Sequence, residues 1–592
     1  MSPIVSRRFV PDHAPAFFPV GLLALVLALL PAPGRAEADV FGLGNAQQGS
    51  LQVRDPGFVI NTSTPLAADV PAGVTELSVV DASGFAAGQL VMVLQMGGEQ
   101  PLSEYRDDKV KLGRSGEGAG RWELARLSEV ATGVLRLTAP LVSPFSRASQ
   151  VVLVPEYKDV RIQNTGSLRA PAWNGRSGGV LAFLATGTVF NQGSLEADGM
   201  GFQGGAAEAG VAGSSYDCAA LDGPAGSGGA SGGGARKGEG LASALSGAPT
   251  RGYGQLANGG GGGNCHDSGG GGGGHVGQGG RGARSSQETT ERDVGGRGGA
   301  ALRYEPLERL LLGGGGGAGI EGSAGGAGGG IIFVRAREIQ GPKPRGFITA
   351  NGLAAPSSVG MHGGGGGGGA GGTVHVRVAQ SLGCTGLSAK GGAGADSDTA
   401  PGGGGGGGLL FVQSSGGVPP ECTASAGSGL AGNSPQGTRG AEPVVDGASD
   451  FEGDQSVIDQ GFVVPAVPSF VSPGAGADDV DPLPRFEGRT APGASVQVFL
   501  DGAPLGAPVV ADEAGNFVLV SPVELAKGPH EVHAWAELLR VRSVTSEALG
   551  FTVGEGLSLQ VGFGCGVAPA GGAWGLGLGV LVLSLGARRR RE

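Results

Sequence analysis

The sequence has few aromatic residues and few charges, and both shortages limit what the chain can be. Phe, Trp and Tyr make up 5% of the 592 residues, and Asp, Glu, Lys and Arg make up 16%. Large side-chain cores are therefore not expected along most of the chain. The net charge is −11, and Lys and Arg do not cluster before the last residues. Because phosphate binding needs clustered positive charge, nucleic acid is not expected as a partner.

Glycine is what the sequence has in excess. Gly (126) and Pro (36) together make 162 of 592 residues, a share at which low complexity is the default. From residue 199 to 415 a unit recurs that consists of an apolar strand, a polyglycine run and a second strand. Residues 347–352, 363–369 and 373–378 form one copy, and residues 387–391, 402–408 and 409–412 form another. Copies spaced roughly 40 residues apart predict a solenoid or an array.

The polyglycine runs allow two interpretations. They are either flexible linkers between strands, or extended polyglycine-II helices that pack through backbone contacts beside a stacked β scaffold. Glycine is costly to order, but an apolar strand follows each run directly, and a linker needs no such register. This favours the ordered form. A collagen helix is excluded, because the runs have no Gly-X-Y period.

The rest of the chain is also predicted to be mainly β. Residues 50–198 contain short β-rich runs such as 89–95 and 150–154, which predict an N-terminal all-β domain. Residues 416–484 are rich in Pro and small residues and predict a linker. Residues 485–553 again alternate between apolar and polar, with an Asp501-Gly502 hairpin signal, and predict a compact β-sandwich.

Five cysteines are present, and four of them lie among the glycine-rich segments: Cys218, Cys265, Cys384 and Cys422. In an oxidising compartment the spacing favours Cys218–Cys265 and Cys384–Cys422 among three possible pairings. Cys265 and His266 together could suggest a metal ligand pair, but no second spaced pair accompanies them. We therefore expect disulfides and no metal.

The two ends of the sequence indicate where the protein goes. Residues 1–38 combine Arg7 and Arg8, an apolar run too short to span a bilayer, and a small-residue cleavage site, which together predict a secretory signal peptide. Residues 562–592 contain Cys565, an apolar stretch and a cluster of arginines from Arg588 to Arg591. Arginines at the end of such a stretch belong on the cytoplasmic side, so the remainder is expected outside the membrane.

This C-terminal segment resembles the MYXO-CTERM sorting tail of myxobacterial surface proteins, which has a Gly-Cys element, a short hydrophobic helix and terminal arginines. The resemblance implies processing or lipidation at Cys565 and delivery to the cell surface. Many members of that family carry more than one cysteine here, whereas this chain has one. An ordinary C-terminal anchor helix is the alternative.

Residues 485–553 resemble bacterial Ig-like domains in the pieces 488–496, 500–502, 515–517 and 528–530. Such domains imply a stalk or an adhesion module. Taken together, the signal peptide, the glycine-rich repeats, this domain and the tail resemble myxobacterial proteins described as adventurous gliding motility proteins. That resemblance covers most of the chain in its organisation and brings no catalytic residues with it.

Motifs that suggest an enzyme are explained by the glycine content. Gly199-x-Gly201-x-x-Gly204 fits a dinucleotide fingerprint, but more glycine follows it instead of the helix that would hold a pyrophosphate. Inside the repeats the carboxylates are sparse, among them Asp198, Asp396 and Asp398, whereas glycoside hydrolysis needs a pair. We expect no cofactor and no catalytic residues. The sequence predicts a secreted structural or adhesion protein of the cell surface that contacts extracellular polysaccharide or other surface proteins. A polysaccharide-binding or polysaccharide-degrading β-solenoid is the alternative.

Overall fold

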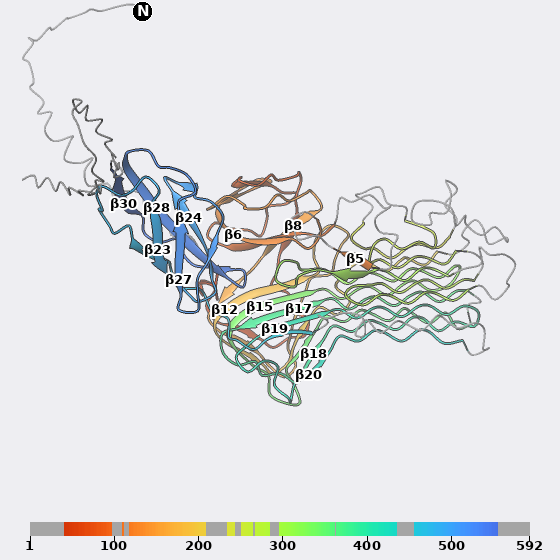
Figure 1. Cartoon of the computed structure of the whole chain (residues 1–592). Coiled ribbons are helices and arrows are strands. Elements are labelled where there is room, and N and C mark those ends of the chain that lie inside the picture. Colours follow the sequence, from red (N-terminus) through yellow and green to blue (C-terminus); the bar gives the residue numbers. More distant parts are fainter. Residues whose placement is uncertain are drawn as a thin grey trace, which may run out of the picture.

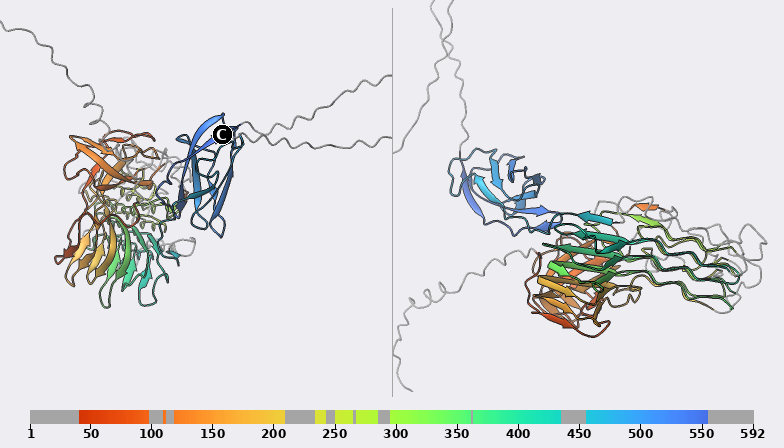
Figure 2. Two further views of the ribbon diagram at one scale, coloured as in Figure 1. Left: turned by 90° about the vertical axis from the view of Figure 1, so that its left-hand side faces the viewer. Right: turned by 90° about the horizontal axis from the view of Figure 1, so that it is seen from below.

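The computed structural model describes residues 41–97, 109–111, 118–208, 234–242, 250–264, 267–284, 295–360, 363–434 and 455–554. Over these residues the fold consists of strands β1 to β30 and has no helix (Figures 1 and 2), which confirms the predicted mainly β class. No helix in the described ranges could therefore span a bilayer. The predicted signal peptide 1–38 and the tail 562–592, with Cys565, lie outside the described residues, as do Cys218 and Cys265.

An antiparallel sheet forms the N-terminal part of the fold. Its strand order is β2 (Ser63–Pro65), β8 (Ser149–Leu153), β4 (Leu90–Gln95), β6 (Trp122–Ala131), β7 (Val134–Leu137) and β3 (Glu76–Ser78). Successive side chains of a strand point to opposite faces, and every residue of β4 is buried. Val91 and Val93 pack into a core within the N-terminal part, whereas Leu90 and Met92 pack toward the solenoid described next.

Two parallel sheets form a β-solenoid. The long-strand sheet runs β1 (Leu51–Val53), β10 (Val160–Ile162), β12 (Val180–Asn191), β15 (Ile331–Gln340), β17 (Thr373–Val378), β19 (Leu409–Gln413) and β21 (Gln455–Ile458), with β9 (Glu156–Tyr157) beside β12. The short-strand sheet runs β11 (Ser167–Arg169), β13 (Ser194–Glu196), β16 (Phe347–Thr349), β18 (Gly386–Ser388) and β20 (Thr423–Ser425). The chain passes from one sheet to the other in each coil, so equivalent residues of successive coils are stacked in register.

The long-strand sheet is buried on both faces. Ile332 and Val334 of β15 point into the solenoid interior, together with Val376 and Leu387 of later coils. Phe333, between the two β15 residues, packs instead against the N-terminal sheet. The continuous apolar runs in these strands follow from this double burial, which is typical of parallel sheets.

Sheet membership divides the chain differently from the predicted segments. Strands β1 and β10 to β13 lie within the predicted N-terminal domain 50–198, but they belong to the solenoid sheets. The predicted linker 416–484 contains β20 and β21 of the solenoid and also β22 (Ser469–Ser472) of the next domain. All of these strands except β12 have only three or four residues, and their pairing joins residues that lie far apart in the sequence. A local sequence pattern can therefore mark such a strand but does not show which sheet the strand joins.

Between the short-strand sheet and the following long strand, each coil sends out an extended glycine-rich loop. We call the loops at 199–208, 234–242, 250–284, 295–330, 350–372, 389–408 and 426–434, in their described parts, the glycine array. Figure 1 shows them running side by side away from the two sheets. They contain almost no regular strand. Backbone N–H and C=O groups of neighbouring segments are nevertheless bonded to one another, and this supports the ordered interpretation of the polyglycine runs. Strand β14 (Ala301–Arg303), at the edge of the array, pairs with β5 (Lys109–Lys111).

Residues 269–274 illustrate how the array is bonded. Every third N–H group donates to the same neighbouring segment, at N–O distances of 2.7–3.0 Å. Residues 269 and 272 donate to the carbonyl groups of 283 and 280, residues 270 and 273 to those of 365 and 368, and residues 271 and 274 to those of 261 and 258. Their carbonyl groups accept in the same steps, from residues 296 and 299, 403 and 406, and 317 and 314. One extended segment is thus bonded to six neighbours. A three-residue repeat is the geometry of a polyproline-II-type helix, here made of glycine.

The C-terminal sandwich (residues 469–553) consists of two antiparallel sheets. One has β22, β23 (Arg485–Arg489) and β27 (Asn516–Val520), and the other has β24 (Ser495–Leu500), β25 (Ala503–Pro504), β26 (Val509–Val510), β28 (Gly528–Leu538), β29 (Val541–Arg542) and β30 (Leu549–Val553). Phe486 and Phe517 of the first sheet share a core with Val498 and Val532 of the second. The predicted hairpin turn is present: Asp501 and Gly502 both have positive φ, at 49° and 83°, as a tight two-residue turn requires.

Candidate functional site

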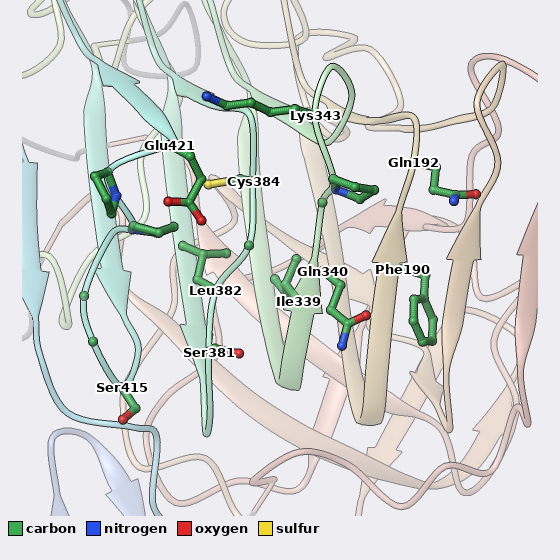
Figure 3. A pocket seen from close by; sticks show the side chains of 17 residues that line it. Phe190, Gln192, Ile339, Gln340, Lys343, Ser381, Leu382, Cys384, Ser415 and Glu421 are labelled. Atoms are coloured by element: carbon green, nitrogen blue, oxygen red, sulfur yellow. The ribbon is translucent and has the colours of Figure 1, made fainter.

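The turns that follow the long strands form a hollow on the described surface. Because β12, β15, β17 and β19 are parallel and in register, the turns after them are stacked at one edge of the solenoid. They enclose a groove of about 720 Å³, which we call the turn groove (Figure 3). It crosses several coils, so the residues that line it lie more than two hundred positions apart in the sequence.

The turn groove has an apolar floor and a polar rim. Ile339, Leu382 and Cys384 are buried beneath it. The rim carries exposed polar and charged side chains: Gln192, Gln340, Lys343, Ser381, Ser415 and Glu421. Phe190 lies at one end of the groove (Figure 3), with the guanidinium of Arg161 4.9 Å from the centre of its ring. This combination of an aromatic ring, amides, hydroxyls and one charge of each sign is suited to polar ligands with apolar faces.

Several contacts hold the rim in place. The carboxylate of Glu338 accepts hydrogen bonds from Gln340 Nε2 and Ser381 Oγ, both at 3.0 Å. These two side chains come from successive coils, so Glu338 fixes their spacing along the groove. Arg345 Nη1 donates to the carbonyl of Asn164 at 2.7 Å.

A disulfide lies beneath the same groove. Cys384 precedes β18 and Cys422 precedes β20, and the bond joins two neighbouring coils across a sequence separation of 38 residues, with Cα atoms 5.1 Å apart. This confirms the second of the two predicted pairings. Because Cys384 lines the groove, the bond restrains the floor and the turn that carries Glu421.

The carboxylates considered in the sequence for catalysis are scattered. Asp198 follows β13, and its carboxylate accepts from Thr349 Oγ1 at 3.0 Å and Asn351 N–H at 2.6 Å, while burial raises its pKa. Asp396 and Asp398 lie in the glycine array, where they accept from the backbone N–H groups of residues 433 and 360. Each of them connects one coil to the next. None of the three lines the turn groove.

The described residues show neither a metal-ligand cluster nor a phosphate-binding role for the dinucleotide-like motif. No group of three or more His, Cys, Asp and Glu side chains could hold a metal ion there. The glycines of the dinucleotide-like motif serve the array: a Cβ added at Gly201 or Gly204 would lie 2.2 Å or 2.0 Å from a carbonyl oxygen of residue 329 or 325. Sequence reasoning missed the turn groove, because no motif marks turn residues contributed by separate coils.

Comparisons with known proteins give little. No protein-family model and no curated protein matches the chain. Among solved structures it is similar to a carbohydrate acetylesterase from Xanthomonas citri, with 24% identity over 15% of this chain and 19% of that one, at a TM-score of 0.12. It is also similar to the tailspike of Acinetobacter baumannii bacteriophage AP22, solved in complex with A. baumannii capsular saccharide, with 9% identity over 64% and 62% of the two chains and a TM-score of 0.13.

The tailspike gp61 of Pseudomonas phage phi297 is a third similar structure, with 12% identity over 84% of each chain and a TM-score of 0.13. The chain spans less than two thirds of the length of the acetylesterase and of the AP22 tailspike. At these TM-scores none of the three supports a statement about function.

Proposed function

We propose that this protein is a secreted, non-enzymatic surface protein that binds a polysaccharide chain in the turn groove. The observation that carries the proposal is the groove itself, a hollow that crosses stacked coils of a solenoid. An extended polymer fits a site of this shape better than a compact small molecule does, because the polar rim is repeated from coil to coil. The ring of Phe190 offers a sugar an apolar face, and the amides and hydroxyls offer hydrogen bonds.

The composition of the groove supports binding without cleavage. Glycoside hydrolysis uses two carboxyl groups, one on each side of the bond that breaks. Glu421 is the single carboxylate among the residues that line the groove. Glu338 lies close by, but Gln340 and Ser381 already donate to its two oxygens. The groove therefore offers charge and hydrogen bonds and lacks the paired acids of that reaction.

The predicted signal peptide and sorting tail would place this groove outside the cell, where polysaccharide is available. The glycine array would then act as a stiff projection, because each of its segments is bonded to neighbours on several sides. A role in adhesion during gliding is the expectation that follows from the resemblance of the whole chain.

The test of binding uses the mature, secreted chain and extracellular polysaccharide purified from the producing cells. We expect the protein to pellet with the polymer, and we expect Lys343→Ala combined with Phe190→Ala to weaken binding at least about tenfold, or about 1.4 kcal/mol. Lys390→Ala is the matched control, since Lys390 is also exposed but lies outside the groove. Equal binding by both variants would contradict the proposal.

The test of catalysis follows reducing ends in the same mixtures. We expect none to be released above the rate of the polymer alone. Release that disappears in Glu421→Gln would instead show a hydrolase.

Whole-cell protease shaving tests the cellular location. The wild-type chain should be exposed and retained on the cell surface, and the Cys565→Ala variant should be lost from it. Equal retention of the two would refute the sorting-tail assignment.

A further inference from the structure

Two arginines on neighbouring strands of the long-strand sheet are buried side by side. Arg335 of β15 and Arg377 of β17 are partners in the parallel register, and they are 2% and 1% exposed. Val334 and Val376 point into the solenoid interior, so the two arginines point to the other face of the sheet. Buried arginines are rare unless they are paired with an acid.

Neither arginine has an acid partner anywhere in the described part of the chain. The guanidinium of Arg335 lies over the rings of Trp122, Phe333 and Phe462, with its carbon 5.1–5.6 Å from the ring centres, and its Nη1 donates to the Phe41 carbonyl at 3.1 Å.

Among the described residues, the hydrogen-bond acceptors of Arg377 are also neutral. Its Nε donates to Gln413 Oε1 at 2.7 Å and its Nη2 donates to the Leu539 carbonyl at 2.9 Å. Its guanidinium carbon lies 4.8 Å from the centre of the same Phe462 ring that Arg335 contacts. Two positive charges therefore share one aromatic ring.

The carboxylate nearest in sequence to this cluster is occupied elsewhere. Glu123 follows Trp122 on β6, and its two oxygens accept the N–H groups of Val142 at 2.8 Å and Ser143 at 3.2 Å. No ion pair joins it to Arg335 or Arg377 among the described residues. Within the described residues, no acidic side chain neutralises the two buried charges.

Several buried nitrogen atoms around the two arginines also have no acceptor in the described part of the protein. They are Arg335 Nε, Arg377 Nη1, Trp122 Nε1 and both ring nitrogens of His375. His375 is stacked between Phe333 and Phe411, at 5.2 Å and 4.6 Å between ring centres, and lies 6.4 Å from the Trp122 ring. We call Trp122, Arg335, His375 and Arg377 the junction cluster.

We propose that the junction cluster binds a small monovalent anion of the halide class. Taking an unpaired charge out of water is strongly unfavourable, and buried N–H groups without acceptors add to that cost. A single anion among these donors would offset both. The rings of Trp122, Phe333 and Phe462 crowd the two guanidinium groups, so the ligand should be compact.

The position of the cluster gives the anion a structural consequence. Phe41 comes from the N-terminal segment, Trp122 from the N-terminal sheet, Phe462 from the chain that follows the solenoid, and Leu539 from the tip of the β28–β29 hairpin in the C-terminal sandwich. Next to it, Arg540 of that hairpin pairs with Glu308. An anion bound here would hold the sandwich against the solenoid, by keeping Arg377 charged and extended toward the hairpin.

The direct test is crystallographic. Crystals of the secreted chain grown in sodium bromide should show an anomalous scattering peak within hydrogen-bonding distance of Arg335 Nε and Arg377 Nη1. Water alone at this place, with bromide bound elsewhere, would overturn the proposal.

The solution test compares melting temperatures in sodium chloride and sodium gluconate at equal ionic strength, because gluconate is too large for the cluster. Chloride should raise the melting temperature with saturation. We expect Arg377→Lys, which keeps one charge, to shift the half-saturating chloride concentration upward at least tenfold, and Arg377→Met to abolish the difference between the salts. Arg540→Ala is the control: it breaks the neighbouring ion pair and should keep the chloride response. An identical response to both salts in the wild-type chain would also overturn the proposal.

Discussion

The glycine array and the β-solenoid alternate along the chain, yet their interiors are built in opposite ways. In the solenoid, side chains such as Ile332 and Leu387 fill the space between two sheets. In the polyglycine runs of the array, such as residues 269–274, there are no side chains to bury, and backbone N–H and C=O groups of neighbouring segments fill the interior. The solenoid is held together by apolar burial, whereas the array is held together by hydrogen bonds and close contact between main chains.

This difference decides which substitutions each region tolerates. An apolar interior loses energy when an atom is removed, since a cavity remains. The glycine interior leaves no room for an added atom: a Cβ built at most positions would lie about 2 Å from a carbonyl oxygen of the adjacent segment. The array is thus selected for the absence of side chains, and its glycines are required for packing more than for flexibility.

The strongest test of this contrast adds one methyl group to the array. In Gly272→Ala the new Cβ would lie 1.9 Å from the oxygen of Gly404, and no flexible side chain could move aside. We expect a loss of about 5 kcal/mol or more in unfolding free energy, measured by chemical denaturation, together with faster amide exchange of residues 258–274.

Gly427→Ala is the matched control, because nothing lies within 4 Å of its added Cβ. It should change the free energy of unfolding by less than about 0.5 kcal/mol. Similar effects of the two substitutions would mean that the array is loosely packed, and the comparison with the solenoid would fail.

The corresponding test of the solenoid removes atoms. Leu387 of β18 is fully buried between the two sheets, so Leu387→Ala should cost about 2–5 kcal/mol. Val457→Ala, at a half-exposed position of β21, should cost much less. Amide exchange should increase in the short-strand sheet first. If the array exchanged faster than this sheet in Leu387→Ala, the two interiors would not be separate as we describe them.

The sequence predicted the strands of the repeats well, because the signals for them are local. The predicted runs 373–378 and 409–412 correspond to β17 and β19, and the Cys384–Cys422 pairing followed from spacing within one segment. The Asp501-Gly502 turn also needed no distant information. In each case the pattern and the structure involve residues of one chain segment, at most 38 positions apart.

What the sequence left open depends on distant partners. A glycine run carries no side chain that could mark which six segments surround it, so the bonding of residues 269–274 was not predictable. The turn groove was missed because Phe190 and Glu421 meet only when the coils are stacked. Charged residues in a strand usually indicate an exposed face, and the burial of Arg335 and Arg377 reverses that rule.

The smallest expected effect is a pH response that has opposite signs in the array and in the C-terminal sandwich. In the array, His275 is fully buried, its Nδ1 donates to the Gly371 carbonyl at 2.9 Å, and its Nε2 accepts from the Tyr304 hydroxyl at 2.7 Å. Burial lowers the pKa of His275 from 6.5 to about 4. The unfolded chain therefore binds the proton more tightly, and the array should lose stability as the pH falls from about 6.5 toward about 4.

In the sandwich, His530 lies 2.7 Å from both the carbonyl of Ala526 and the carboxylate of Asp501. The carbonyl, followed by the carboxylate, raises the pKa of His530 above 6.5. The stability that His530 contributes is complete below pH 6.5 and is lost as the pH rises through the raised pKa.

Amide exchange measured from pH 5 to pH 8, and corrected for the intrinsic rate, should show the array loosening at the acid end and the sandwich at the alkaline end. His275→Gln should remove the first trend alone and His530→Gln the second alone. A common trend in both regions would show that they open as one unit. The array and the sandwich would then differ in how they are packed but not in how their stability depends on pH.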